Sequence, residues 1–279
     1  MQVQFLTVAL GLAAAIVWGG GDFCGGQATR RASVFSVLLV AEISGLLMLI
    51  GLAIAQREPL PSLVTLKWSL AAGLMGAIGL AALYQALSIG QAGVVAPVSA
   101  VLAAAIPALY GALTEGLPDA LHLVGFALAL VAVWLVAQSN ETKEGIQGLG
   151  LALVAGCGFG CFFILIHYAS ATTTFGPLAI ARATAIPLVL GTAIYRRATW
   201  KPTRAMLPIA LLCGILDAGG NALFVLAAQA GRLDVAAILS SLYPASTVIL
   251  AWALLGERTT WVQKTGIVAA LAAIALIAS

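Results

Sequence analysis

One continuous apolar run, residues 235–257, sets the strongest limit on what this chain can fold into. It reads VAAILSSLYPASTVILAWALLGE and carries no charged side chain before its closing glutamate. A helix that crosses the hydrocarbon layer of a membrane needs about 20 residues, so this run is long enough to span it. Similar runs fill the chain, in which 62% of residues are hydrophobic and 8% are charged, whereas soluble domains carry about 25% charged residues.

The sequence therefore predicts an all-α polytopic membrane protein, because backbone polar groups in lipid must pair within their own helix. The first run lacks the basic segment and cleavage site of a secretory signal, so we expect it to remain as a helix. Charged or polar breaks separate ten expected spans: residues 5–23, 34–55, 67–88, 94–113, 120–138, 147–168, 176–195, 205–229, 235–255 and 261–278.

These ten spans form two related sets of five. Residues 235–257 resemble residues 93–115, and both Ser99 with Ser241 and Glu115 with Glu257 stand 142 residues apart (241 − 99 and 257 − 115). A spacing of 141 relates further pairs: Trp18-Gly19 with Phe159-Gly160, Gly73 with Gly214, Gly79 with Gly220, Gly90 with Gly231, and Gly125 with Gly266.

An odd number of spans in each set makes the second set enter the membrane from the opposite side. We therefore expect a first five-helix repeat at 1–139, a loop at 140–146 and an inverted repeat at 147–279. Inverted repeats are typical of transporters, in which two mirrored gates give alternating access to one site near the membrane midplane.

The chain resembles the drug/metabolite transporter superfamily, in particular its EamA-type ten-helix members. The resemblance rests on the two repeats, on the aromatic-glycine pair in the first helix of each, and on the small-residue runs YGALTE and LLGE after the fourth helices. It implies a central cavity lined by the first, third, fourth, sixth, eighth and ninth helices, and movement of small metabolites that is often driven by protons. The family often has an arginine in the second helix of each repeat; Arg182 fits, but Glu42 stands at the first position (182 − 42 = 140).

Four ionisable residues fall within expected spans: Asp22, Glu42, Arg182 and Asp217. A charge near the bilayer centre costs about 2.5–3.5 kcal/mol on insertion scales, so each needs a partner or a purpose. Asp217 either contacts substrate or hydrogen-bonds Asn221 one turn later, and Asp22 either lines the cavity or caps a helix end. For Glu42 and Arg182 we expect pairing with polar groups on neighbouring helices rather than contact with substrate. Candidate proton carriers are Asp22, Glu42 and Asp217, since a buried carboxyl can titrate near neutral pH.

Aromatic rings with a few polar groups usually line small-molecule cavities. By this criterion the expected substrate-binding residues are Trp18, Asp22, Tyr84, Gln85, Ser99, Phe159, Asp217, Asn221, Ser241 and Tyr243. Each uncharged member, taken singly, fits helix packing better. A cavity that is acidic and aromatic favours a cation, or a zwitterion with an amine, through charge pairing and cation–π contact.

The sequence thus predicts a secondary active transporter, an exporter of a small organic metabolite with possible proton coupling, and not an enzyme. Expected partners are the substrate, the lipid bilayer and protons; no nucleic acid, cofactor or metal is expected, and the GxxxxGK[ST] loop of ATPases is missing. An intramembrane enzyme would draw its nucleophile from Ser240, Ser241 or Cys161 with His167 as base, but neither GxSxG nor HExxH occurs. A channel would need a continuous polar stripe, which the alanine-rich spans do not offer.

The expected location is the bacterial cytoplasmic (inner) membrane. If the N-terminus were cytoplasmic, three basic residues would lie in inside loops and nine in outside loops. By the positive-inside rule this places both termini outside, whereas the family resemblance implies both termini inside.

Overall fold

The computed structural model describes residues 2–89, 92–137, 148–256 and 259–278, and within these ranges the chain is helical with short connections and has no strand. Ten helix segments are long and apolar enough to cross a membrane, with α9 and α10 together forming the span Leu233–Leu255. The predicted all-α, ten-span architecture is confirmed. The helices are α1 (Gln2–Thr29), α2 (Val34–Ala55), α3 (Leu63–Ile89), α4 (Ala92–Thr114), α5 (Ala120–Ala137), α6 (Leu149–Ala169), α7 (Phe175–Tyr195), α8 (Leu207–Ala230), α9 (Leu233–Ser240), α10 (Tyr243–Leu255) and α11 (Trp261–Ala278).

The helices pack in pairs that repeat from one half of the chain to the other. α1 packs along α8 while α6 packs along α3, and α2 faces α7 as α5 faces α11. A Cβ built on Gly125 would lie 2.7 Å from Ile277 Cγ1, and one built on Gly266 would lie 2.7 Å from Val136 Cγ2. The two glycines are 141 residues apart (266 − 125), and so are the two residues that they contact (277 − 136). Equivalent residues therefore make equivalent contacts, as two inverted repeats require.

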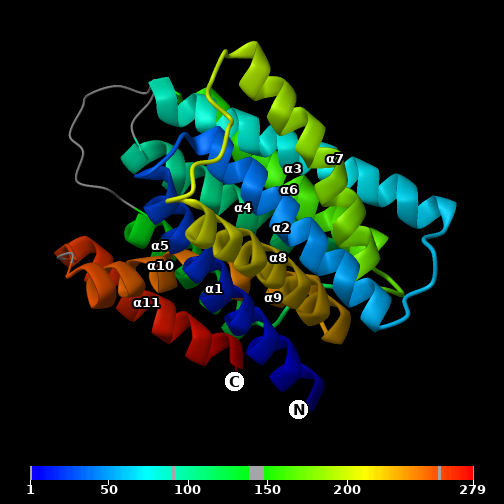
Figure 1. Cartoon of the computed structure of the whole chain (residues 1–279). Helices are drawn as coiled ribbons and strands as arrows, with labels where there is room; N and C mark the ends of the chain where they lie inside the picture. The colour runs from blue at the N-terminus through cyan, green and yellow to red at the C-terminus, as the bar shows by residue number, and fades with distance from the viewer. Residues whose placement is uncertain (1, 90–91, 138–147, 257–258, 279) are drawn as a thin grey trace.

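The two chain ends lie at the same end of the bundle (Figure 1). We call this the termini side; it also carries the α2–α3, α4–α5, α6–α7 and α8–α9 connections. The far side carries the α1–α2 and α7–α8 connections. The predicted inter-repeat loop, residues 140–146, lies outside the described residues.

The ninth span is broken, where the sequence suggested one helix over 235–255. α9 ends at Ser240 and α10 begins at Tyr243, because Pro244 has no N–H for the Ser240 carbonyl and its ring clashes with that carbonyl. The Ser240 hydroxyl donates to Ala237 O at 3.2 Å, and the Ser241 hydroxyl donates to Ile238 O at 2.7 Å. These hydroxyls help to satisfy carbonyls next to the break, as Ser and Thr do in interrupted membrane helices.

Two glutamates on the termini side accept hydrogen bonds from the starts of helices in the second repeat. Glu58 accepts from the N–H groups of Thr174, Phe175 and Gly176 at 2.7–3.0 Å, at the start of α7. Glu115 accepts from the Leu233 N–H at 3.2 Å, at the start of α9. Glu115 therefore joins the two repeats, because unpaired N–H groups at a helix start favour an anion.

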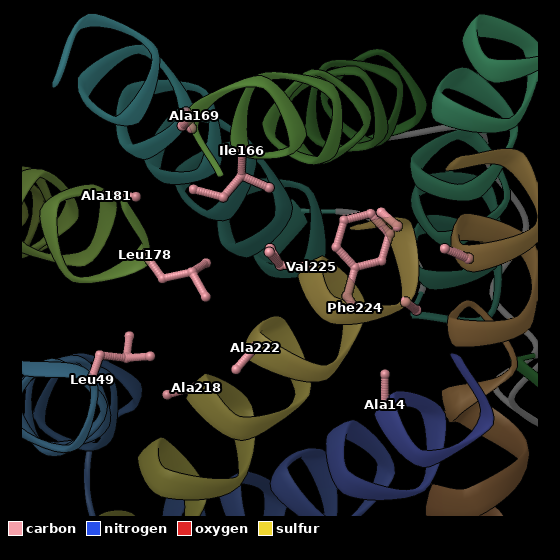
Figure 2. Close-up of a cluster of buried hydrophobic side chains, with 14 of the residues drawn as sticks. Ala14, Leu49, Ile166, Ala169, Leu178, Ala181, Ala218, Ala222, Phe224 and Val225 are labelled. Carbon is pink, nitrogen blue, oxygen red and sulfur yellow. The ribbon is translucent and has the colours of Figure 1, made fainter. Parts of the chain in front are cut away.

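The largest buried cluster lies where α2, α7 and α8 meet and continues toward α1 and α6. Its members include Leu49 of α2, Leu178 of α7, and Ala218 and Ala222 of α8, all at most 6% exposed. Figure 2 shows these side chains gathered between their helices, with Phe224 further along α8. This packing fixes α8 against α2, which positions the ionisable residues described next.

Candidate functional site

Glycines bring α2, α7 and α8 close enough for their ionisable side chains to meet. A Cβ on Gly214 of α8 would lie 2.1 Å from the Ala41 carbonyl oxygen of α2. A Cβ on Gly45 of α2 would lie 2.9 Å from Cζ of Arg182. Neither position leaves room for a side chain, so α8 lies directly on α2 and the Arg182 guanidinium lies across Gly45. Small residues permit such close approaches between membrane helices.

Arg182 is shared by two carboxylates from different helices. Its Nη1 donates to Glu42 Oε2 at 3.1 Å, and its Nη2 donates to Asp217 Oδ2. The side chains of Arg182 and Glu42 are 9% and 15% exposed, whereas that of Asp217 is 46% exposed. Glu42 and Arg182 thus form an ion pair within the bundle. Asp217 is the only one of these three residues whose side chain is half-exposed.

Asp22 of α1 adds a fourth charge beside this triad. Its side chain is exposed although it lies within α1, and its carboxylate is close enough to that of Asp217 for electrostatic repulsion. Cys213 and Tyr243 lie within the field of both aspartates. Three carboxylates against one guanidinium give the cluster a formal charge of −2 when all are ionised. We call Asp22, Glu42, Arg182 and Asp217 the acidic cluster.

An aromatic wall adjoins the acidic cluster. The Trp18 ring centroid lies 5.6 Å from that of Phe163, 6.1 Å from that of Phe224 and 6.2 Å from that of Tyr243. Trp18 Nε1 donates to the Asp217 backbone carbonyl at 3.2 Å. The ring lies over Gly220, where a Cβ would come within 2.3 Å of Trp18 Cδ1. One indole therefore connects the wall to the helix turn that carries Asp217.

Asn221 also hydrogen-bonds to the turn of α8 that carries Asp217. Its Nδ2 donates to the Asp217 backbone carbonyl at 2.8 Å, so the printed bond runs to the backbone of Asp217 and not to its carboxylate. Asp217 faces open space, while Phe224 lies in the buried core at 0% exposed.

Of the remaining predicted residues, those with described side chains make their contacts outside the acidic cluster. The ring of Phe159 packs on Gly79, with Cδ1 3.0 Å from the Cβ position there, which repeats the packing of Trp18 on Gly220 in the other half. Ser99 is buried and donates to Ala96 O at 3.1 Å, and the Ser241 hydroxyl is used beside the α9–α10 break. Gln85 is half-buried on α3, and the side chain of Tyr84 lies outside the described part of the structure.

Two residues near the acidic cluster were missed by sequence reasoning. Cys213 was not singled out, but it lies one turn of α8 before Asp217, and its Sγ is 3.2 Å from the Cβ position of Gly25 on α1. Phe163 was not singled out, although it stands 141 residues after Asp22 (163 − 22) and so occupies the equivalent position. The repeat spacing was the signal that pointed to Phe163.

The groups proposed for an intramembrane enzyme do not form a nucleophile–base pair. The Ser240 and Ser241 hydroxyls donate to carbonyls of their own helix segment. His167 Nδ1 is buried and, among the described residues, has no hydrogen-bond partner. A catalytic nucleophile needs a base within hydrogen-bond reach. In the same described residues, no group of three or more His, Cys, Asp and Glu side chains is placed to hold a metal ion.

Comparison with known proteins agrees with this architecture. The sequence matches the model of the EamA-like transporter family twice, over residues 5–138 and 146–279. A comparison with curated protein sequences finds no match. Among solved structures 29 chains match; one, described as a crystal structure of a protein, is 12% identical, covers 97% of this chain and 95% of its own, and has a TM-score of 0.76. That likeness shows a shared fold. Because the family model covers both repeats, this integral membrane protein belongs to the EamA-like transporter family.

Proposed function

We propose that the protein is a secondary active transporter that exports a small organic cation, or a zwitterion carrying an amine, from the bacterial cytoplasm. The observation that carries this proposal is the half-exposed Asp217 carboxylate, paired with the buried Arg182 and adjoined by the exposed Asp22. An excess of negative charge within a membrane bundle is costly and marks an ion or substrate pathway. A cationic substrate is the ligand that would lower this cost.

The chemistry of the site supports an amine. A substrate ammonium would pair with Asp217 and Asp22 while Arg182 keeps its bond to Glu42, and its positive charge would lie near the faces of Trp18 and Tyr243. The same carboxylates would take up protons when the substrate leaves, which couples export to proton entry. The two repeats would rock about this site, so that it opens to each side of the membrane in turn.

A thermal-shift screen of the purified protein is the first test. Amines, amino acids, sugars and organic anions would each be added at two pH values, since a ligand that binds the folded state raises its melting temperature. We expect stabilisation by amines or amine-bearing zwitterions that weakens at the lower pH. Stabilisation by organic anions alone would overturn the proposal and make Arg182 the substrate contact.

Transport in proteoliposomes then tests the role of Asp217. The Asp217→Asn variant should fold but lose pH-driven flux of the stabilising amine, because the amide neither holds the ammonium by charge nor carries the proton. Asp119→Asn is the matched control, since Asp119 is an exposed aspartate between α4 and α5. Equal pH-driven flux through both variants would contradict the assignment of the site.

A further inference from the structure

A crevice opens between α2, α3 and α7. None of the four residues of the acidic cluster lines it. The side chains from α2 and α3 and the first two from α7 are apolar, and Thr192 and Arg196 lie where α7 ends on the far side. The lining consists of Phe35, Leu38, Ala77, Leu80, Ala81, Leu188, Val189, Thr192 and Arg196.

The inverted repeat gives this crevice a counterpart, and that counterpart is closed. Gly214 meets Ala41 as Gly73 meets Ala181, so α2 and α7 correspond at a spacing of 140 (181 − 41), and α3 and α8 at 141 (214 − 73). These spacings relate crevice residues to members of the buried cluster in Figure 2. The counterparts of Leu38, Val189, Ala77 and Ala81 are Leu178, Leu49, Ala218 and Ala222, which are 2%, 0%, 0% and 6% exposed. In the crevice, Val189 and Ala77 are also buried, at 6% and 5% exposed, but Leu38 is half-buried and Ala81 is exposed. The two copies therefore differ in packing at the positions of Leu38 and Ala81.

The mouth of the crevice also differs in charge. The counterparts of Thr192 and Arg196 are Leu52 and Gln56 (192 − 140 and 196 − 140), so the position of Arg196 carries a charge in the open crevice and none in its closed counterpart. Ser36 Oγ of α2 donates to the carbonyls of Thr199 and Lys201 at 3.3 and 3.1 Å. These bonds hold the α7–α8 connection, which carries four basic residues, over the start of α2: Arg196, Arg197, Lys201 and Arg204.

We propose that the crevice binds an anionic phospholipid. One acyl chain lies between α2, α3 and α7, and the phosphate is held by the Arg196 guanidinium. An apolar groove in a membrane bundle is filled by lipid, and an arginine at its mouth selects a negative headgroup through charge-assisted hydrogen bonds. Basic pockets between membrane helices bind anionic headgroups in this way. This site does not depend on the identity of the transported substrate.

The closed counterpart gives the lipid a conformational role. In a transporter with inverted repeats, the second conformation is reached when the two repeats exchange their arrangements. The far-side crevice would then close and the cluster on the termini side would part. A lipid that occupies the open crevice binds one conformation better than the other and therefore raises its population. This second step rests on the proposed function, whereas binding itself does not.

Lipid binding is tested on purified full-length protein in a neutral detergent. Phosphatidylglycerol and phosphatidylcholine with identical acyl chains would be titrated, and bound lipid counted by native mass spectrometry. We expect the wild type to bind phosphatidylglycerol about 10- to 100-fold more tightly than phosphatidylcholine, the factor that one hydrogen bond to a charged group contributes. Equal binding of the two lipids would overturn the proposal.

Variants locate the site. The pair Thr192→Leu and Arg196→Gln gives the crevice the residues of its closed counterpart and should remove the preference for phosphatidylglycerol. Ala81→Leu fills the groove from α3 and should weaken both lipids while Arg196 stays in place. Arg204→Gln is the control, because Arg204 belongs to the same connection but does not line the crevice. If Arg204→Gln lowers the preference as much as the double variant, the lipid recognises the basic surface in general and the crevice assignment is wrong.

Discussion

The contact of α1 with α8 and the contact of α6 with α3 are structural copies, yet they place opposite chemistry inside the bundle. On α8, Asp217 lies against Gly21 of α1, where a Cβ would be 3.3 Å from the Asp217 amide nitrogen. In the copy, Gly76 stands in place of the aspartate, and a Cβ there would be 3.3 Å from Cδ2 of Phe162. Phe162 is the counterpart of Gly21 (162 − 21 = 141), so each copy pairs one glycine with one larger side chain.

This comparison separates scaffold from site. Backbone contacts repeat, because glycines at matching positions permit the same close approach in both halves. The side chains at this crossing do not repeat: a carboxylate occupies one copy and an aromatic ring the other. The repeat therefore supplies a common scaffold, and the departures from symmetry place a charged cluster on one side of it.

Removing the cation that Glu42 and Asp217 share should cause the largest loss of stability. Arg182→Met leaves Glu42 and Asp217 without their partner, and breaking a buried ion pair by deleting one member costs about 3–5 kcal/mol. Thermal unfolding in detergent would measure the loss. A triple variant that also carries Glu42→Gln and Asp217→Asn should recover most of it, because no uncompensated charge remains. If the triple variant is as unstable as the single one, lost packing and not charge is responsible.

Copying the aspartate into the other half should have the next largest effect. In Gly76→Asp the new carboxylate would face Glu42, which occupies the position equivalent to Arg182, and an unpaired charge within a membrane span costs about 2.5–3.5 kcal/mol. Gly76→Asn is the matched control, since its side chain has the same size without the charge. A fall in unfolding temperature that is equal for both would assign the cost to the Phe162 ring beside position 76.

Adding a methyl group to the repeated glycine contacts should give two similar, smaller losses. A Cβ would lie 2.1 Å from a carbonyl oxygen at Gly214 and 2.4 Å from one at Gly73. Gly214→Ala and Gly73→Ala should each cost about 1–3 kcal/mol, the usual penalty of overpacking. Gly191→Ala, with nothing within 4 Å of its Cβ, should be neutral or slightly stabilising. Unequal losses at Gly73 and Gly214 would show that the scaffold itself is asymmetric.

The smallest expected effect concerns the starts of α5 and α11, which are also copies. Asp119 Oδ1 accepts from the His122 N–H at 2.9 Å, and Thr260 Oγ1 accepts from the Gln263 N–H at 3.1 Å (260 − 119 = 141). The backbone hydrogen bond from His122, followed by the contact with its ring, lowers the pKa of Asp119 below its usual value of 3.8. A carboxyl whose pKa is lower in the folded state stabilises the fold above the unfolded pKa, and this contribution is lost as the pH falls through the folded pKa.

Asp119→Thr would make the α5 start a copy of the α11 start. Because threonine does not titrate, the variant should lose a small part of the decline in unfolding temperature that the wild type shows in the acid range, below about pH 4. Unfolding temperatures recorded against pH would reveal the difference. Identical pH profiles for variant and wild type would mean that the Asp119–His122 contact does not contribute to stability.

The sequence was sufficient for the ten spans, their inverted relation and the positions of the four ionisable residues within them. It did not reveal the break at Ser241, because a proline within a span does not always interrupt the helix. Pro97 and Pro107 lie inside the continuous helix α4, whereas the helix is interrupted just before Pro244, between α9 and α10. Nor did it show that Arg182 binds Glu42 and Asp217 together, residues 140 and 35 positions away along the chain.

What the sequence determined by itself is which segments must leave water, because hydrophobicity adds up along a segment and needs no knowledge of neighbours. The tertiary structure alone decided which side chains meet inside. That outcome depends on how each helix is rotated and how closely glycine lets it approach the next. For this reason the repeat spacing could predict which positions are equivalent. Only the packed bundle shows that Leu49 and Leu178 are buried between their helices, while a crevice beside Arg196 opens at the equivalent place in the other repeat.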